Sequence, residues 1–183
     1  MSTVLSVALG LCFVVSNAPA QQLNPQQRAQ GIAASFNKTK HKIKEKRGFR
    51  EESFTEVRNQ PVVRQDVRDY SGTYVAIGLG CAINIEVNSN GRVVGNGSEP
   101  GAEKIRKFTL KDAKIEGALL LGTKVYEDGT LEKFEGAFIN RTQRNSPTDN
   151  GVATFGLGVL YDPPKVENDY GFTLTKLFYE LKK

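Results

Sequence analysis

The sequence predicts an all-β protein: a small antiparallel meander β-barrel of about eight strands, preceded by a basic N-terminal arm. Three observations favour this fold class: strict apolar alternation in residues 74–87, further alternating segments after it, and Gly-containing turn signals between them. In residues 74–87 the apolar side chains occupy every odd position, namely Val75, Ile77, Leu79, Cys81, Ile83, Ile85 and Val87. A period of two is that of an extended chain with one buried face, so these residues are expected to face the core.

Residues 1–20 have the features of a secretory signal peptide. An apolar run from residue 4 to residue 15 precedes Ala18-Pro19-Ala20, a small-residue cleavage pattern; the alternative is a buried N-terminal helix. Cleavage would remove Cys12 and leave Cys81 as the only thiol, which excludes an intramolecular disulfide. We therefore expect a secreted or periplasmic protein with no transmembrane segment after cleavage. Cys81 is expected to be a small buried hydrophobe, with a reactive thiol as the alternative.

Residues 21–69 form a polar and basic arm, which we expect to be partly disordered or helical. Residues 21–30 are rich in Gln, which is typical of a disordered leader. Residues 38–50 hold seven basic residues and one acidic residue, whereas residues 71–183 hold fourteen of each, so the net charge of +5 arises in the arm. Five lysines alternate in this stretch, and an extended chain would place them on one side: Lys38, Lys40, Lys42, Lys44 and Lys46.

Residues 70–183 are expected to form the barrel, with tight turns between its strands. The two-residue hairpin signals are Asn90-Gly91 and Asp128-Gly129. Both central residues of a type I′ turn need positive φ, which Asn-Gly and Asp-Gly provide. In the second hairpin this turn would place Leu121 opposite Gly136 on the apolar face, and Lys124 opposite Lys133 on the solvent face.

Further strands are expected at residues 104–110, 152–161 and 170–181. The apolar positions of the last segment change phase, and one extra residue near Thr175 or Lys176, a β-bulge, would restore a single buried face. Residues 77–80 and 155–158 both alternate bulky residues with glycines. Such glycines indicate either the bends of a rolled sheet or room for a ligand or for the N-terminal arm.

The start of the barrel segment, Ser71-Gly72-Thr73-Tyr74, resembles the Gly-x-Trp start of lipocalin and avidin-type barrels, with Tyr74 where those calycin-type families place Trp. The resemblance covers residues 70–183 as an architecture. It implies a cup-like barrel that binds an apolar small molecule.

We expect a non-enzymatic protein without a cofactor or a metal site. The single histidine, His41, lies in the basic arm, and the sequence has no nucleophile elbow, zinc-protease, Cys-x-x-Cys or phosphate-loop motif. The first hypothesis is an exported barrel that binds an apolar or amphipathic small molecule, unless side chains fill its interior. The residues expected to line this site are Val75, Ile77, Leu79, Leu121, Phe134, Phe138, Phe155 and Leu157.

The alternative hypothesis is an interaction module of the cell envelope or the extracellular space. The alternating lysines would then contact anionic lipid or polysaccharide through salt-sensitive electrostatics. An exported protein meets little nucleic acid, so no nucleic-acid partner is expected. We further expect the residues before Tyr70 to be dispensable for folding, because their apolar residues are too sparse to form a core.

Overall fold

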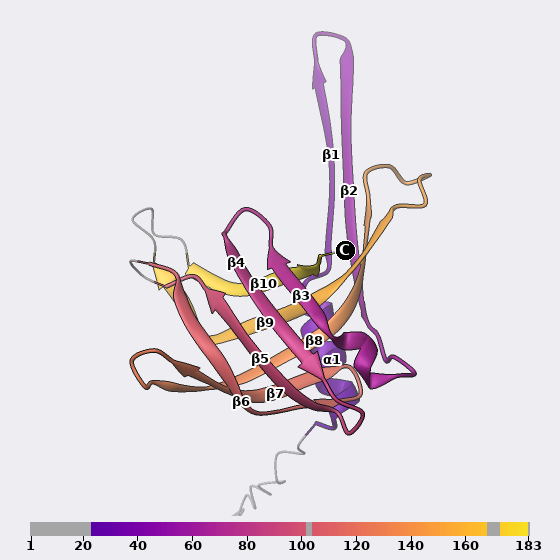
Figure 1. Ribbon diagram of the computed structural model, residues 1–183. Helices are drawn as coiled ribbons and strands as arrows, with labels where there is room; N and C mark the ends of the chain where they lie inside the picture. Colours follow the sequence, from indigo (N-terminus) through magenta and orange to yellow (C-terminus); the bar gives the residue numbers. More distant parts are fainter. Residues whose placement is uncertain (1–22, 102–103, 168–172, 183) are drawn as a thin grey trace, which may run out of the picture.

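The computed structural model describes residues 23–101, 104–167 and 173–182, so the predicted signal peptide with Cys12 lies outside the described residues. Strands β3 to β10 form an antiparallel meander that closes through the β3–β10 pair (Figure 1), which confirms the predicted eight-stranded barrel. The strands are β1 (Lys38–Lys46), β2 (Phe49–Pro61), β3 (Gly72–Ala76), β4 (Cys81–Val87), β5 (Arg92–Glu99), β6 (Arg106–Glu116), β7 (Leu119–Tyr126), β8 (Leu131–Arg144), β9 (Val152–Glu167) and β10 (Thr173–Leu181). No helix among the described residues is both long enough and apolar enough to cross a bilayer.

The alternation in residues 74–87 is interrupted by a turn, so it does not describe one strand with one phase. β3 ends at Ala76, which pairs with Cys81, and residues 77–80 form the connection, with positive φ at Gly78 (82°) and Gly80 (64°). On β3 the core side chains are therefore Tyr74 and Ala76, not the odd-numbered neighbours. On β4 the odd positions do face the core, as predicted.

The β7–β8 hairpin has a three-residue loop, so the register predicted for it is wrong by one residue. The amide of Tyr126 donates to the carbonyl of Thr130 at 3.0 Å, and Gly129 has a positive φ of 80° whereas Asp128 does not. This geometry is a type I turn followed by a left-handed glycine, which forms a bulge. The extra residue exchanges the two faces of β7, because the side-chain period of a strand is two.

The predicted two-residue turn at Asn90-Gly91 is also a three-residue loop. The amide of Asn88 donates to the carbonyl of Arg92 at 3.0 Å, and Gly91 alone of the two turn residues has a positive φ, of 74°. In both hairpins the glycine adopts the left-handed conformation while the preceding Asn or Asp does not. In β10, by contrast, the register shift between Leu174 and Lys176 confirms the predicted β-bulge.

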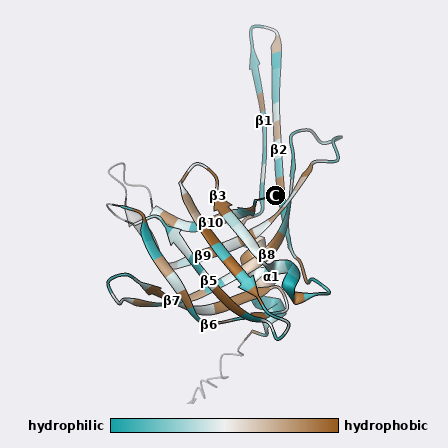
Figure 2. Cartoon of the chain, in the orientation of Figure 1, coloured by the Kyte–Doolittle hydropathy of each residue, from teal (hydrophilic) through white to brown (hydrophobic). Residues whose placement is uncertain are grey.

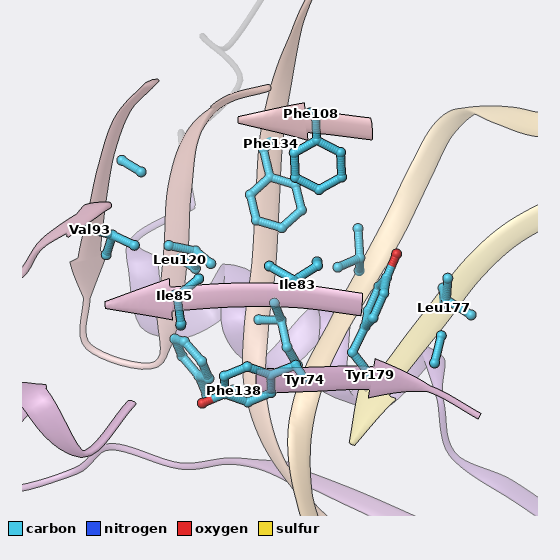
Figure 3. Packing of buried hydrophobic residues seen from close by; sticks show 14 of the residues in the cluster. Tyr74, Ile83, Ile85, Val93, Phe108, Leu120, Phe134, Phe138, Leu177 and Tyr179 are labelled. Atoms are coloured by element: carbon cyan, nitrogen blue, oxygen red, sulfur yellow. The ribbon is translucent and has the colours of Figure 1, made fainter. Parts of the chain in front are cut away.

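The barrel interior is filled by aromatic and aliphatic side chains (Figure 3). Phe138 is fully buried. Its ring stacks on that of Tyr70, with the centroids 4.1 Å apart, and on that of Phe155, with the centroids 6.1 Å apart. Tyr70 belongs to the 3-10 helix η1 (Val67–Tyr70), and its hydroxyl donates to the carbonyl of Val62 at 2.8 Å. The short helix therefore ties the chain before the barrel to the barrel core.

A helix, α1 (Pro25–Ser35), packs against the outer face of the barrel, and the disordered leader expected over residues 21–30 is wrong from Pro25 onward. The side chain of Asn24 accepts the amide of Gln27 at 2.9 Å, and the side chain of Gln27 accepts the amide of Asn24 at 3.0 Å. This reciprocal pair is a capping box that starts the helix. A second buried cluster joins the helix to the outer face: Ala29, Ile32, Ala33, Phe36, Ala118, Leu119, Ala137 and Ile139.

The ring of Phe36 lies on the outer surface of β9 at Gly158, one of the glycines that the sequence marks as room for a ligand or the arm. A Cβ at this position would lie 2.9 Å from Phe36 Cε2 and 2.5 Å from Ile139 Cδ1. Gly158 therefore permits the close approach of the segment that follows α1. Whether the residues before Tyr70 are dispensable for folding stays a prediction, although their removal would expose this cluster.

Gly158→Ala is expected to lower the free energy of unfolding by about 1–3 kcal/mol, because the added methyl group overpacks the contact with Phe36 and Ile139. Urea denaturation of the full chain measures this change. As a control, Gly158→Ala is also made in a chain that already carries Phe36→Ala, where it should lower the free energy of unfolding by less. An equal effect in both backgrounds would contradict the assigned contact.

Candidate functional site

The β1–β2 hairpin projects from the barrel (Figure 1). β2 pairs with β8 only from Glu56 to Pro61, and β1 pairs with β2 alone. Residues 40–55 thus extend beyond the barrel sheet as a two-stranded ribbon about 23 Å long, given about 3.3 Å per residue. Its base is held by β8, while its outer part pairs with no other strand that the structure describes.

A tight turn at Arg47 and Gly48 sets the faces of this hairpin. Both residues have positive φ, 52° and 81° respectively, as a two-residue type I′ turn requires. Lys46 consequently lies opposite Phe49. Directly opposed residues of an antiparallel pair share a face, so the register assigns every side chain of the hairpin to one face or the other.

The alternating lysines share one face of the hairpin, which we call the lysine face. It consists of Lys38, Lys40, Lys42, Lys44 and Lys46 from β1 and of Phe49, Glu51, Ser53, Thr55 and the buried Val57 from β2. All nine residues of β1 are exposed. Five lysines and one glutamate give this face a charge of 5 − 1 = +4. None of the five lysines forms an ion pair with a residue that the structure describes.

The opposite face of the hairpin carries the acidic residues. They are Glu45, Glu52 and Glu56. Glu56 is ion-paired with Arg58 and Arg144, so the remaining residues Glu45, Glu52 and Arg50 give a charge of 1 − 2 = −1, with His41 counted as neutral. The carboxylate of Glu52 lies 2.5 Å from Nε2 of His41, whose ring packs edge-on against Phe54. The hairpin is drawn mainly in hydrophilic colours in Figure 2, and its two faces differ in the sign of their charge.

The structure places only half of the predicted ligand-binding residues toward the barrel interior. Phe134, Phe138 and Leu157 are buried in the core, and Phe155 packs against it. The interior placement expected of the other four, Val75, Ile77, Leu79 and Leu121, is wrong. Val75 has the opposite phase, Ile77 and Leu79 lie exposed in the β3–β4 turn, and Leu121 packs outside against the α1 cluster. The turn in residues 77–80 and the bulged hairpin account for these differences.

A charged pair lies inside the barrel, where the predicted register had placed a solvent-facing lysine. The side chain of Lys124 is 2% exposed, and its Nζ lies 2.5 Å from Oε2 of Glu99, which is 1% exposed. The hydroxyl of Tyr126 also donates to Glu99. Three aromatic rings surround the ammonium group, with centroids 4.9–5.2 Å from Nζ: Phe108, Phe134 and Tyr161. Opposite charge and ring faces together compensate the loss of hydration of the cation.

Burial raises the pKa of ionisable groups near this pair. It is the main cause that raises the pKa of Tyr126 and of Tyr161, and the Glu99 carboxylate raises both further. Burial also raises the pKa of Cys81, whose Sγ donates to the carbonyl of Leu79 at 3.4 Å. A fully buried, protonated thiol agrees with the interpretation of Cys81 as a small hydrophobe.

The closed antiparallel barrel of eight strands is consistent with a calycin-like architecture. Its first strand, β3, begins with the segment Gly72-Thr73-Tyr74, and Tyr74 is fully buried. The projecting lysine face carries a charge of +4 outside the barrel core. In comparisons with protein-family models, with curated proteins and with solved structures, nothing matches this chain.

Proposed function

We propose that this chain is a non-enzymatic interaction module that acts outside the cytoplasm and docks on an anionic surface through its lysine face. The observation that carries this proposal is the segregation of charge on a projecting hairpin, +4 on one face and −1 on the other once the ion-paired Glu56 is left out. Each lysine near an anionic lipid surface contributes about 1 kcal/mol of attraction, which salt screens. The barrel acts as the rigid scaffold that presents the hairpin.

Folding stability alone does not account for the hairpin. Ordering a residue costs about 1–2 kcal/mol of conformational entropy, and isolated two-stranded hairpins are marginal in water. The nine residues of β1 are all exposed, so this strand gains little from burial. Lysines on an edge strand also prevent edge-to-edge pairing, but edge protection does not require a projecting ribbon. A contact with an external surface gives the exposed lysines a role.

A charge-matched pair of variants tests the proposal. The first replaces Lys38, Lys40, Lys42, Lys44 and Lys46 with Gln. The control replaces five exposed lysines of the barrel, Lys104, Lys107, Lys111, Lys133 and Lys182, with Gln. Both have the same net charge. At low salt, the first should lose about three orders of magnitude in affinity for anionic vesicles or acidic polysaccharide, and the control much less. Equal losses would contradict docking by the lysine face.

The second candidate function is the binding of an apolar or amphipathic small molecule, as in lipocalins. It is supported by the calycin-type barrel and by the interior position of Phe134, Phe138, Phe155 and Leu157. Their tight packing means that a ligand must displace side chains to enter. Native mass spectrometry of the protein isolated from its own source tests this function: a retained apolar molecule supports it, and its consistent absence contradicts it.

A further inference from the structure

Phe49 is an exposed aromatic residue at the tip of the lysine face. Its side chain is 82% exposed, the largest exposed fraction among the large hydrophobic residues that the structure describes. It lies opposite Lys46 and directly follows the turn of Arg47 and Gly48. Three basic residues therefore flank it in sequence: Lys46, Arg47 and Arg50. No residue that the structure describes buries this ring, which therefore points to a partner with an apolar layer.

An anionic phospholipid bilayer offers both features that the tip requires. Its headgroups carry the negative charge that lysines bind, and the boundary beneath them accepts aromatic rings. Side chains of a strand stand roughly perpendicular to the sheet, so Phe49 and the lysines point in the same direction. A hairpin that lies on the bilayer with its lysine face can thus contact phosphates and insert the ring at the same time.

We propose that the hairpin docks on an anionic phospholipid bilayer and inserts Phe49 among the lipids below the headgroups. This inference rests on the proposed function and names the surface that the lysine face binds. The opposite face of the hairpin carries a charge of −1 beside the ion-paired Glu56, so only the lysine face attracts an anionic bilayer, and this sets the orientation. Glu51 is the single acid on the lysine face, and it lies opposite Lys44.

The absence of Trp from the chain makes a direct optical test possible. Phe49→Trp places a single indole at the tip, and Ile43→Trp places one on the opposite face as the control, at an exposed position of β1. With vesicles of phosphatidylglycerol and phosphatidylcholine, the fluorescence of Phe49→Trp should shift to the blue and lose its quenching by acrylamide. The fluorescence of Ile43→Trp should change much less. Binding without a shift at position 49 would overturn insertion.

A truncation of the ring separates insertion from electrostatics. Phe49→Ala should weaken partitioning to the same vesicles about tenfold, because part of an aromatic side chain no longer leaves water. Its retention on dextran sulfate, an acidic polysaccharide without an apolar layer, should not change. An unchanged affinity for vesicles would overturn insertion alone. Binding of the wild type to dextran sulfate but not to vesicles would overturn the lipid surface while supporting the proposed function, and binding to neither would overturn both.

Discussion

Lys124→Met is expected to lower the free energy of unfolding by about 3–5 kcal/mol, because it removes the cation from a buried ion pair. The Glu99 carboxylate would stay in the barrel interior without the ammonium group that now lies 2.5 Å from it. Chemical denaturation of the full chain measures the loss. The aromatic rings around Nζ can pack against a thioether, so steric mismatch adds little.

Two further variants distinguish the charge effect from general sensitivity of this region. Adding Glu99→Gln to Lys124→Met removes both charges, so the double variant should recover part of the lost stability. Lys133→Met changes an exposed lysine of the neighbouring strand β8 and should alter stability by at most about 0.5 kcal/mol. A loss for Lys124→Met no larger than that for Lys133→Met would show that the buried pair has no structural importance.

Alkaline pH is expected to unfold the barrel cooperatively. Burial raises the pKa of four tyrosines of the barrel: Tyr74, Tyr126, Tyr161 and Tyr179. In the unfolded chain these groups ionise at about pH 10. Their folded pKa values are higher, so their contribution to stability is complete below pH 10 and is lost as the pH rises above it. Each contributes a slope of about 1.4 kcal/mol per pH unit in this range.

Phenolate absorbance and circular dichroism, followed together, test this expectation. Phenolate should appear in the same transition in which the β-type spectrum disappears, because these hydroxyls ionise only when the barrel opens. If the phenolate signal of all the tyrosines developed near pH 10 while the spectrum stayed native, the burial of the hydroxyls would be contradicted.

Simple periodicity predicts much of this fold. A period of two in the barrel segment indicates strands with one buried face, and the change of phase near Thr175 indicates the bulge that β10 contains. The same rule places alternating lysines on one side of an extended chain, which is their arrangement in β1. These features depend on the local geometry of the strand, so the sequence alone is sufficient.

Turn geometry is what the sequence leaves undetermined. Asp-Gly fits both a two-residue type I′ turn and a three-residue loop with a left-handed glycine, and the two differ by one residue in register. In β7 the longer loop turns Leu121 outward and Lys124 inward, so both the predicted lining residue and the buried ion pair depend on it. The start of α1 was readable from Asn24 and Gln27, whose spacing is that of a capping box.

The salt dependence of vesicle binding tests most directly whether the lysine face is the docking surface. Affinities of the wild type and of the two charge-matched lysine variants would be measured on the same anionic vesicles over a series of salt concentrations. We predict a steep loss of affinity with salt for the wild type and for the barrel-lysine control, and a nearly flat dependence for the variant without the five hairpin lysines. An equally steep dependence for that variant would contradict docking by the lysine face, because the charges that bind the surface would then lie elsewhere on the protein.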